Sequence, residues 1–114
     1  MISGIRLLVY PVQDVAKAKL LYKKLLDVEP YADEEYYVGF RVGDQEIGLD
    51  PNGYKKGMRG PLGYYQVEDI QESLKTLLEA GAQVQQDVTD VGGGKLIASV
   101  RDIDGNAIAL LQNP

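Results

Sequence analysis

A short sequence pattern occurs twice in the chain, and this repeat constrains the fold more than any other feature. Residues 12–15 (Val-Gln-Asp-Val) correspond to residues 67–70 (Val-Glu-Asp-Ile), and residues 46–49 (Glu-Ile-Gly-Leu) correspond to residues 107–110 (Ala-Ile-Ala-Leu). A repeat on this scale indicates that one supersecondary unit has been duplicated. The 114 residues match the usual size of one domain, so both copies are expected to belong to a single domain.

Hydrophobic periodicity predicts a strand, a helix and further strands in the first copy. Residues 5–10 form an apolar, β-rich run, and Asp14 can cap a helix over residues 15–26, in which apolar residues recur at helical spacing. Alternating patterns over residues 36–42 and 45–50 predict two strands joined by a Gly-Asp turn.

The second copy repeats this order after a segment that is rich in glycine and proline. Residues 51–63 lack apolar periodicity, which predicts a linker or mobile loop. Residues 64–67 read as a strand, and Asp69 begins a helix with Glu72 three residues later, a capping-box spacing. Gly81 suits the left-handed end of that helix. Three more strands are expected at residues 82–88, 95–101 and 107–112.

The predicted fold is therefore α+β, with two βαβββ modules that form a curved, partly open mixed sheet around a cleft, with the helices outside. Module one covers about residues 4–51, a linker about residues 52–61, and module two about residues 62–114. A cleft between curved sheets is a natural site for a small ligand.

Charge and hydropathy exclude several classes of partner. The chain has 17 acidic and 12 basic residues, a net charge of -5, which disfavours binding to nucleic acid or to an anionic membrane surface. It contains no apolar run long enough to span a bilayer, and its N-terminus lacks a signal-peptide pattern. We expect a soluble, cytoplasmic protein.

The chain contains neither cysteine nor histidine. The absence of cysteine excludes disulfides, thiolate metal sites and a cysteine nucleophile. The absence of histidine removes both the commonest metal ligand and the commonest general base. These two absences narrow the possible chemistry more than any motif does.

Tyrosine is the most informative residue type, since there are eight tyrosines but one phenylalanine and no tryptophan. A tyrosine combines a flat apolar ring with a hydroxyl group, which suits a surface that stacks on a planar ligand. Strand alternation makes Tyr37 and Tyr64 the preferred ligand-binding candidates, whereas Tyr22 is expected in the core and Tyr10 and Tyr65 on the side facing the helices.

Polar residues on the same strand faces complete the candidate ligand-binding set. Glu46 and Asp50 share a strand face with Gly48, although an acidic residue near a strand end is more often simply solvated. The remaining candidates, which could supply hydrogen bonds or positive charge, are Arg41, Ser99 and Arg101. No catalytic residue can be assigned from these positions.

Several motifs resemble those of the vicinal oxygen chelate superfamily, which includes glyoxalase I, extradiol dioxygenases and bleomycin-resistance proteins. The resemblance covers nearly the whole chain. It rests on the Val-x-Asp start of each helix, the Leu21-Tyr22 pair followed by Leu26, the Ala-Gly-Ala sequence at residues 80–82 and the turn at residues 101–106. That turn is similar to the family's Asp-Pro-Asp-Gly-Asn, with Ile103 in place of proline, and Asp27 stands where the family usually has glycine.

The resemblance also implies where a metal would bind in metal-dependent relatives: on the first and last strand of each module, usually through histidine or glutamate. In this sequence those positions hold Leu7, Gly48, Leu62 and Ala109. None of them has a side chain that can donate an electron pair to a metal. We therefore predict no metal and no cofactor.

Two functions of different classes remain. The first is a metal-free protein that binds a small aromatic or cationic compound without chemistry, as bleomycin-resistance proteins do. The alternative is a metal-independent isomerase or lyase acting on a small oxygenated substrate, with Tyr64, Glu46 or Asp50 as acid or base. The sequence contains no paired acid and base, which favours binding over catalysis. The resemblance further implies a homodimer.

Overall fold

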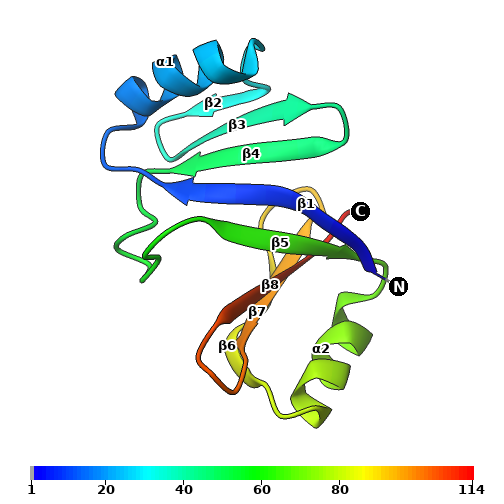
Figure 1. Cartoon of the computed structure of the whole chain (residues 1–114). Coiled ribbons are helices and arrows are strands. Elements are labelled where there is room, and N and C mark those ends of the chain that lie inside the picture. The colour runs from blue at the N-terminus through cyan, green and yellow to red at the C-terminus, as the bar shows by residue number, and fades with distance from the viewer. Residues whose placement is uncertain (1) are drawn as a thin grey trace. The chain divides into compact units, whose positions relative to one another are not determined.

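The computed structural model describes residues 2–114. Eight strands form an open mixed sheet, and two helices complete the α+β architecture (Figure 1). The strand order is β2-β3-β4-β1-β5-β8-β7-β6. β1 pairs with β4, and β5 with β8, in parallel, whereas the pairs β2-β3, β3-β4, β6-β7 and β7-β8 are antiparallel, so the predicted fold class is confirmed. The strands are β1 (Ile2–Pro11), β2 (Ala32–Glu34), β3 (Tyr37–Val42), β4 (Gln45–Asp50), β5 (Leu62–Val67), β6 (Gln83–Asp90), β7 (Leu96–Arg101) and β8 (Ala107–Gln112).

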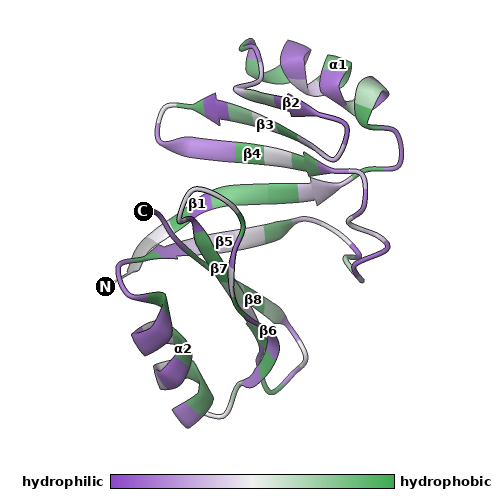
Figure 2. Ribbon diagram, turned by 180° about the vertical axis from the view of Figure 1, so that it is seen from behind, coloured by the Kyte–Doolittle hydropathy of each residue, from purple (hydrophilic) through white to green (hydrophobic). Residues whose placement is uncertain are grey.

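The chain divides into two compact units, each containing one helix. The first unit is Leu7–Leu62, with helix α1 (Val15–Leu26), and the second unit is Gly63–Pro114 together with the beginning of β1 up to Arg6, with helix α2 (Ile70–Glu79). Both helices carry hydrophobic and hydrophilic residues in alternation, as amphipathic helices covering one face of a sheet do (Figure 2).

In the first unit, α1 packs on β3 and β4. Asp14 caps the helix by accepting a hydrogen bond from the backbone N–H of Lys17 at 3.1 Å, and Asp27 ends it in a left-handed conformation with φ 57°. Glycine adopts this conformation most easily, which agrees with the expectation from the resemblance that glycine usually stands at this position. The helix covers a core of Val38, Phe40 and Leu49.

Tyr10 and Tyr22 belong to this helical side of the first unit, as the sequence predicts. Their ring centroids are 5.2 Å apart, and both rings pack against the buried core. A pair of tyrosines in this arrangement contributes buried area and a favourable ring–ring contact. Packing therefore accounts for both residues without a role in ligand binding.

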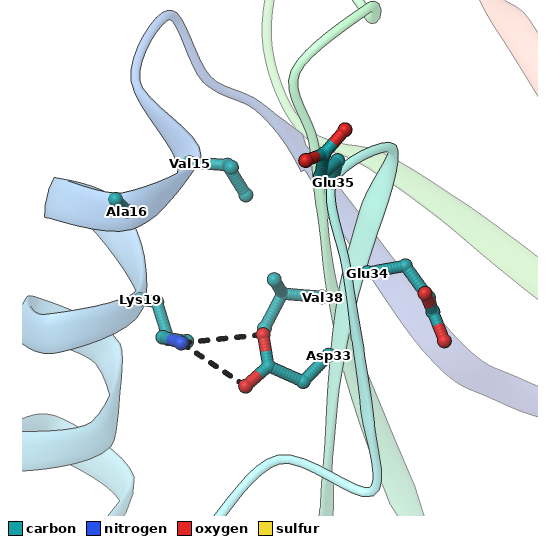
Figure 3. Close-up of a pocket in the computed structure, with 7 residues that line it drawn as sticks. All are labelled: Val15, Ala16, Lys19, Asp33, Glu34, Glu35 and Val38. Atoms are coloured by element: carbon teal, nitrogen blue, oxygen red, sulfur yellow. Dashed lines mark hydrogen bonds and ion pairs between the residues drawn. The ribbon is translucent and has the colours of Figure 1, made fainter.

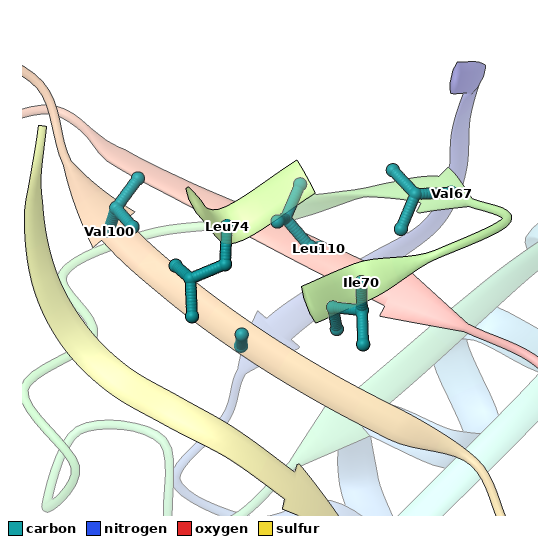
Figure 4. Packing of buried hydrophobic residues seen from close by; sticks show 6 residues of the cluster. Val67, Ile70, Leu74, Val100 and Leu110 are labelled. Atoms are coloured by element: carbon teal, nitrogen blue, oxygen red, sulfur yellow. The ribbon is translucent and has the colours of Figure 1, made fainter. Parts of the chain in front are cut away.

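The second unit builds its core from the same elements. Asp69 caps α2 by accepting a hydrogen bond from the backbone N–H of Glu72 at 3.1 Å, and Gly81 follows the helix with φ 108°. The buried side chains shown in Figure 4 come from β5, α2, β7 and β8, and they comprise Val67, Ile70, Leu74, Ala98, Val100 and Leu110.

Two local features differ from the sequence-based expectation. The short strand β2 was not predicted, because its three residues are polar or small and show no alternation. The segment after β4, expected to be a linker or mobile loop, forms consecutive turns that this expectation did not specify, and in them Met58 donates a backbone hydrogen bond to the Gly53 carbonyl at 3.0 Å. Asp50 anchors these turns, as described below.

Candidate functional site

The two glycines Gly39 and Gly48 lie directly opposite each other on β3 and β4, and both are covered by tyrosine rings. The ring of Tyr31 lies 2.8 Å from the point where a Cβ atom of residue 39 would be. The ring of Tyr37 lies 2.7 Å from the corresponding point at residue 48. Because glycine has no side chain, two aromatic rings can lie directly on the backbone of the sheet here.

Tyr31 links this aromatic layer to two charged residues. Its hydroxyl donates a hydrogen bond to Glu46 Oε1 at 2.5 Å, and the Arg41 guanidinium carbon lies 4.3 Å from the centroid of its ring. A guanidinium at this distance interacts favourably with the electron-rich face of an aromatic ring. Tyr31, Tyr37, Arg41 and Glu46 therefore form one continuous group of side chains, which we call the tyrosine face.

The surroundings of Tyr31 change its ionisation. Burial raises the pKa of Tyr31 well above its usual value near 10, and the hydrogen bond to Glu46 and the nearby Tyr37 act in the same direction, whereas Arg41 acts to lower it. The phenol is therefore neutral at physiological pH. It can donate and accept hydrogen bonds, but it does not act as a phenolate base.

The positions at which the family resemblance implies metal ligands carry no donor side chain. In the first unit, Leu7 lies opposite Glu46 and Val9 opposite Gly48, and the hydroxyl of Tyr37 occupies the space next to residue 48 that a side chain would fill. In the second unit, Ala109 lies opposite Tyr64. Residues 2–114 contain no group of three or more His, Cys, Asp or Glu side chains that could hold a metal. The residues present therefore do not fit the metal of the metal-dependent relatives.

Three candidates predicted from sequence meet in the first unit, and the structure adds a fourth. Tyr37, Arg41 and Glu46 share one sheet face, as the strand alternation indicates. Tyr31 was missed because it precedes β2, the strand that the sequence did not reveal. A tyrosine before a short polar segment carries no periodic signal, so only its contact with β3 and β4 identifies it.

Asp50, also predicted as a ligand-binding residue, has intramolecular partners for both carboxylate oxygens. The backbone N–H of Asn52 donates to Oδ1 at 2.8 Å, and Lys56 Nζ lies 2.9 Å from Oδ2. The Asp50 side chain is largely buried. These contacts give Asp50 a structural role, because they hold the turns that follow β4.

The candidates in the second unit lie on β5 and β7. Tyr64 and Ser99 are both register partners of Ala109, so all three share one face, and Ser99 is only 6% exposed. Arg101 Nη1 donates to the carbonyl oxygen of Gly105 at 2.8 Å, which commits part of its guanidinium to the turn before β8. A ligand-binding role for Tyr64, Ser99 and Arg101 stays a prediction.

A separate pocket of about 190 Å³ lies between α1 and the β2–β3 hairpin (Figure 3). Its floor includes Val15 and Val38, and its only ammonium group, on Lys19, is 3.0 Å from Asp33 Oδ2. Glu34 and Glu35 complete the rim. The pocket is small and open and its cation is already paired, so it offers less to a ligand than the tyrosine face.

Comparison with known proteins identifies the family. A sequence profile of the Glyoxalase/Bleomycin resistance protein/Dioxygenase superfamily matches residues 4–110. The chain belongs to this superfamily. No curated protein matches the sequence.

Solved structures share the fold of this chain at low sequence identity. A hypothetical protein from Bacillus halodurans is 16% identical, with 96% of this chain and 94% of that chain covered and a TM-score of 0.79. Methylmalonyl-CoA epimerase from Mycobacterium tuberculosis is 16% identical, with 99% and 89% covered and a TM-score of 0.75. A superfamily member from Vibrio splendidus is 13% identical, with 99% and 100% covered and a TM-score of 0.72. At these identities the likeness concerns the fold alone.

The described part of the chain has no helix with the length and apolar character needed to cross a membrane. Both helices are amphipathic elements of 12 and 10 residues that pack on strands of their own unit.

Proposed function

We propose that this superfamily member binds a small planar compound at the tyrosine face without a metal. The observation that carries the proposal is the layer of two tyrosine rings on the paired glycines, with Arg41 and Glu46 fixed beside it. Aromatic rings held against a sheet provide a stacking surface, and the hydroxyl and charged groups around them can orient a ligand.

The local chemistry favours binding over catalysis. The neutral phenol of Tyr31 donates its hydrogen bond to Glu46. The Oε1 atom of Glu46 accepts that bond, so it is less available to take a proton from a substrate. A metal-independent isomerase or lyase would need an acid or base near its reacting atom. Glu46 is the residue that would supply it, so product formation that depends on Glu46 is the outcome that would favour the enzyme.

Of the two ligand classes expected from sequence, the geometry favours an aromatic compound over a purely cationic one. The expectation of a cation rests on the net charge of the whole chain, which acts weakly and at long range. At the tyrosine face itself, the charges are one guanidinium and one carboxylate that already accepts a hydrogen bond.

A panel of planar compounds, screened by thermal shift with and without divalent metals, tests the proposal. We expect stabilisation by some of them, unchanged by chelation, and about tenfold weaker binding after Tyr37→Leu, which is the usual loss when a stacking ring is removed. Tyr54→Leu is the matched control, because Tyr54 is an exposed tyrosine in the turns after β4. Stabilisation by micromolar nickel, zinc or manganese, or equal loss in both variants, would contradict the proposal.

Two further expectations accompany this proposal and rest on family membership and composition. We propose that the protein is a cytoplasmic homodimer. Tyr64 and Ser99 in the second unit are kept as further candidate contacts, and each can be tested by its own variant in the same panel.

A further inference from the structure

We infer that the planar compound carries a carboxylate and that Arg41 is the residue that binds it. The inference rests on the proposed function and narrows it to one class of ligand. It follows from the way in which Tyr31 is placed between Arg41 and Glu46.

Arg41 and Glu46 lie directly opposite each other on the antiparallel strands β3 and β4. Opposite charges in this arrangement usually pair with each other. Here Glu46 accepts a hydrogen bond from the Tyr31 hydroxyl instead, at 2.5 Å. Among residues 2–114 no hydrogen bond or ion pair of the Arg41 guanidinium is found, and its contact is with the ring of Tyr31.

Tyr31 therefore has two effects on Arg41. Its hydroxyl donates a hydrogen bond to the carboxylate of Glu46, which lies opposite Arg41. Its ring lies under the guanidinium, whose carbon is 4.3 Å from the ring centroid. A guanidinium stacked on a ring keeps its N–H groups available at its edge, and these form a planar fork that matches the two oxygens of a carboxylate. The exposed guanidinium of Arg41 is thus oriented and uncommitted.

The corresponding arginine of the second unit, Arg101, does not share this uncommitted guanidinium. Arg101 also lies near the end of its strand, but it donates to the Gly105 carbonyl at 2.8 Å. The negatively charged Glu46 repels the carboxylate of a ligand bound beside it. We therefore expect the affinity to depend on both the attraction by Arg41 and the repulsion by Glu46.

Two isosteric probes, 2-naphthoate and 2-naphthamide, test the inference by titration calorimetry. The planar ring system is the same, and only the charge differs. We expect 2-naphthoate to bind about tenfold more tightly than 2-naphthamide, as for one charge-assisted pair. Arg41→Gln should abolish this preference, whereas Arg59→Gln, an exposed arginine outside the tyrosine face, should leave it unchanged.

Tyr31→Phe separates the two effects of Tyr31, because it keeps the ring and removes the hydroxyl. Glu46 then no longer accepts a hydrogen bond from Tyr31 and can pair with Arg41, so the preference for 2-naphthoate should fall several-fold while binding of 2-naphthamide is kept. Glu46→Gln should instead strengthen 2-naphthoate binding. A merely structural role of Tyr31 would weaken both probes alike.

Equal binding of the two probes, or equal loss of both in Arg41→Gln, would overturn the inference. If neither probe binds while neutral or cationic planar compounds from the panel do, the carboxylate class is wrong and the proposed function stands. If no planar compound binds at all, both fail.

Discussion

Arg41 and Arg101 occupy corresponding strand positions in the two units, and their surroundings differ. Each is followed by a turn and lies opposite a residue near the start of the last strand, Glu46 in the first unit and Ala107 in the second. Arg41 is supported by an aromatic ring, and Arg101 is bound to the carbonyl of a turn residue. Corresponding strand positions therefore do not give an arginine the same contacts; the cross-strand neighbour and the turn decide them.

The same contrast extends across the two sheet faces. Gly39 and Gly48 in the first unit correspond in register to Ser99 and Ala109 in the second. The glycines leave space in which tyrosine rings lie on the sheet, whereas Ala109 has no exposed surface in the structure. Small changes at one pair of positions thus determine whether a face can carry an aromatic layer.

The largest expected effect concerns the cores beneath these faces. Phe40 and Val100 hold equivalent positions, opposite Ile47 and Ile108, and both are 0% exposed. Phe40→Ala should lower the free energy of unfolding by about 3–5 kcal/mol, and Val100→Ala by about 2 kcal/mol, since fewer buried atoms are lost. Urea unfolding followed by circular dichroism measures both. A larger loss for Val100→Ala would mean that the second unit dominates stability.

An intermediate effect is expected at the paired small residues of the two faces. Gly48→Ala places a methyl group against the ring of Tyr37, so Tyr37 must move, at a cost of about 1–3 kcal/mol. The reciprocal change in the second unit, Ala109→Gly, should cost about 0.5–1 kcal/mol through backbone entropy. Unfolding curves measure the two costs, and ring proton shifts of Tyr37 in Gly48→Ala report the displacement. Unmoved Tyr37 resonances would show that the ring does not lie on Gly48.

The smallest effect concerns the turn that holds Arg101. The hydrogen bonds from the side chain and backbone of Asn106 hold the pKa of Asp102 below its usual value. Folding therefore stabilises the ionised form of this carboxyl group relative to its protonated form. Its contribution to stability is present above the unfolded pKa near 3.8 and is lost as the pH falls through the lower folded pKa.

Carboxyl-carbon NMR titration should therefore give Asp102 a midpoint below 3.8, and Asn106→Ala should move this midpoint upward. Asp102 lies in a surface turn and is only partly covered, so the stability of the whole chain should change little. A midpoint at the ordinary value would mean that the turn, and with it the contact of Arg101, is not formed in solution.

Much of the fold could be predicted from local sequence patterns. The strands at residues 45–50 and 107–112 were predicted with the bounds that the structure has, and Asp14 and Asp69 cap their helices as expected. The strand β2 was missed, because three residues do not establish a period. The turns after β4 were missed, because they depend on contacts of Asp50 with residues that follow it.

The candidate site was predicted only in part. Strand alternation places Tyr37 with Arg41 on one face of their strand, and Glu46 with Gly48 on one face of the next strand, and these predictions need no tertiary information. Only the pairing of β3 with β4 joins the two into one face. The commitment of Asp50 and Arg101 to structural hydrogen bonds could not be foreseen, since both depend on how turns close.

By itself, the sequence determined the α+β fold class, the membership of the superfamily and the lack of donor side chains at Leu7, Gly48, Leu62 and Ala109. These follow from side-chain periodicity, capping and residue identity, which act over a few positions. Only the tertiary structure decided that Tyr31 lies between Arg41 and Glu46. That contact requires β2, β3 and β4 to pair in one register, and pairing between distant segments is not encoded in any local pattern.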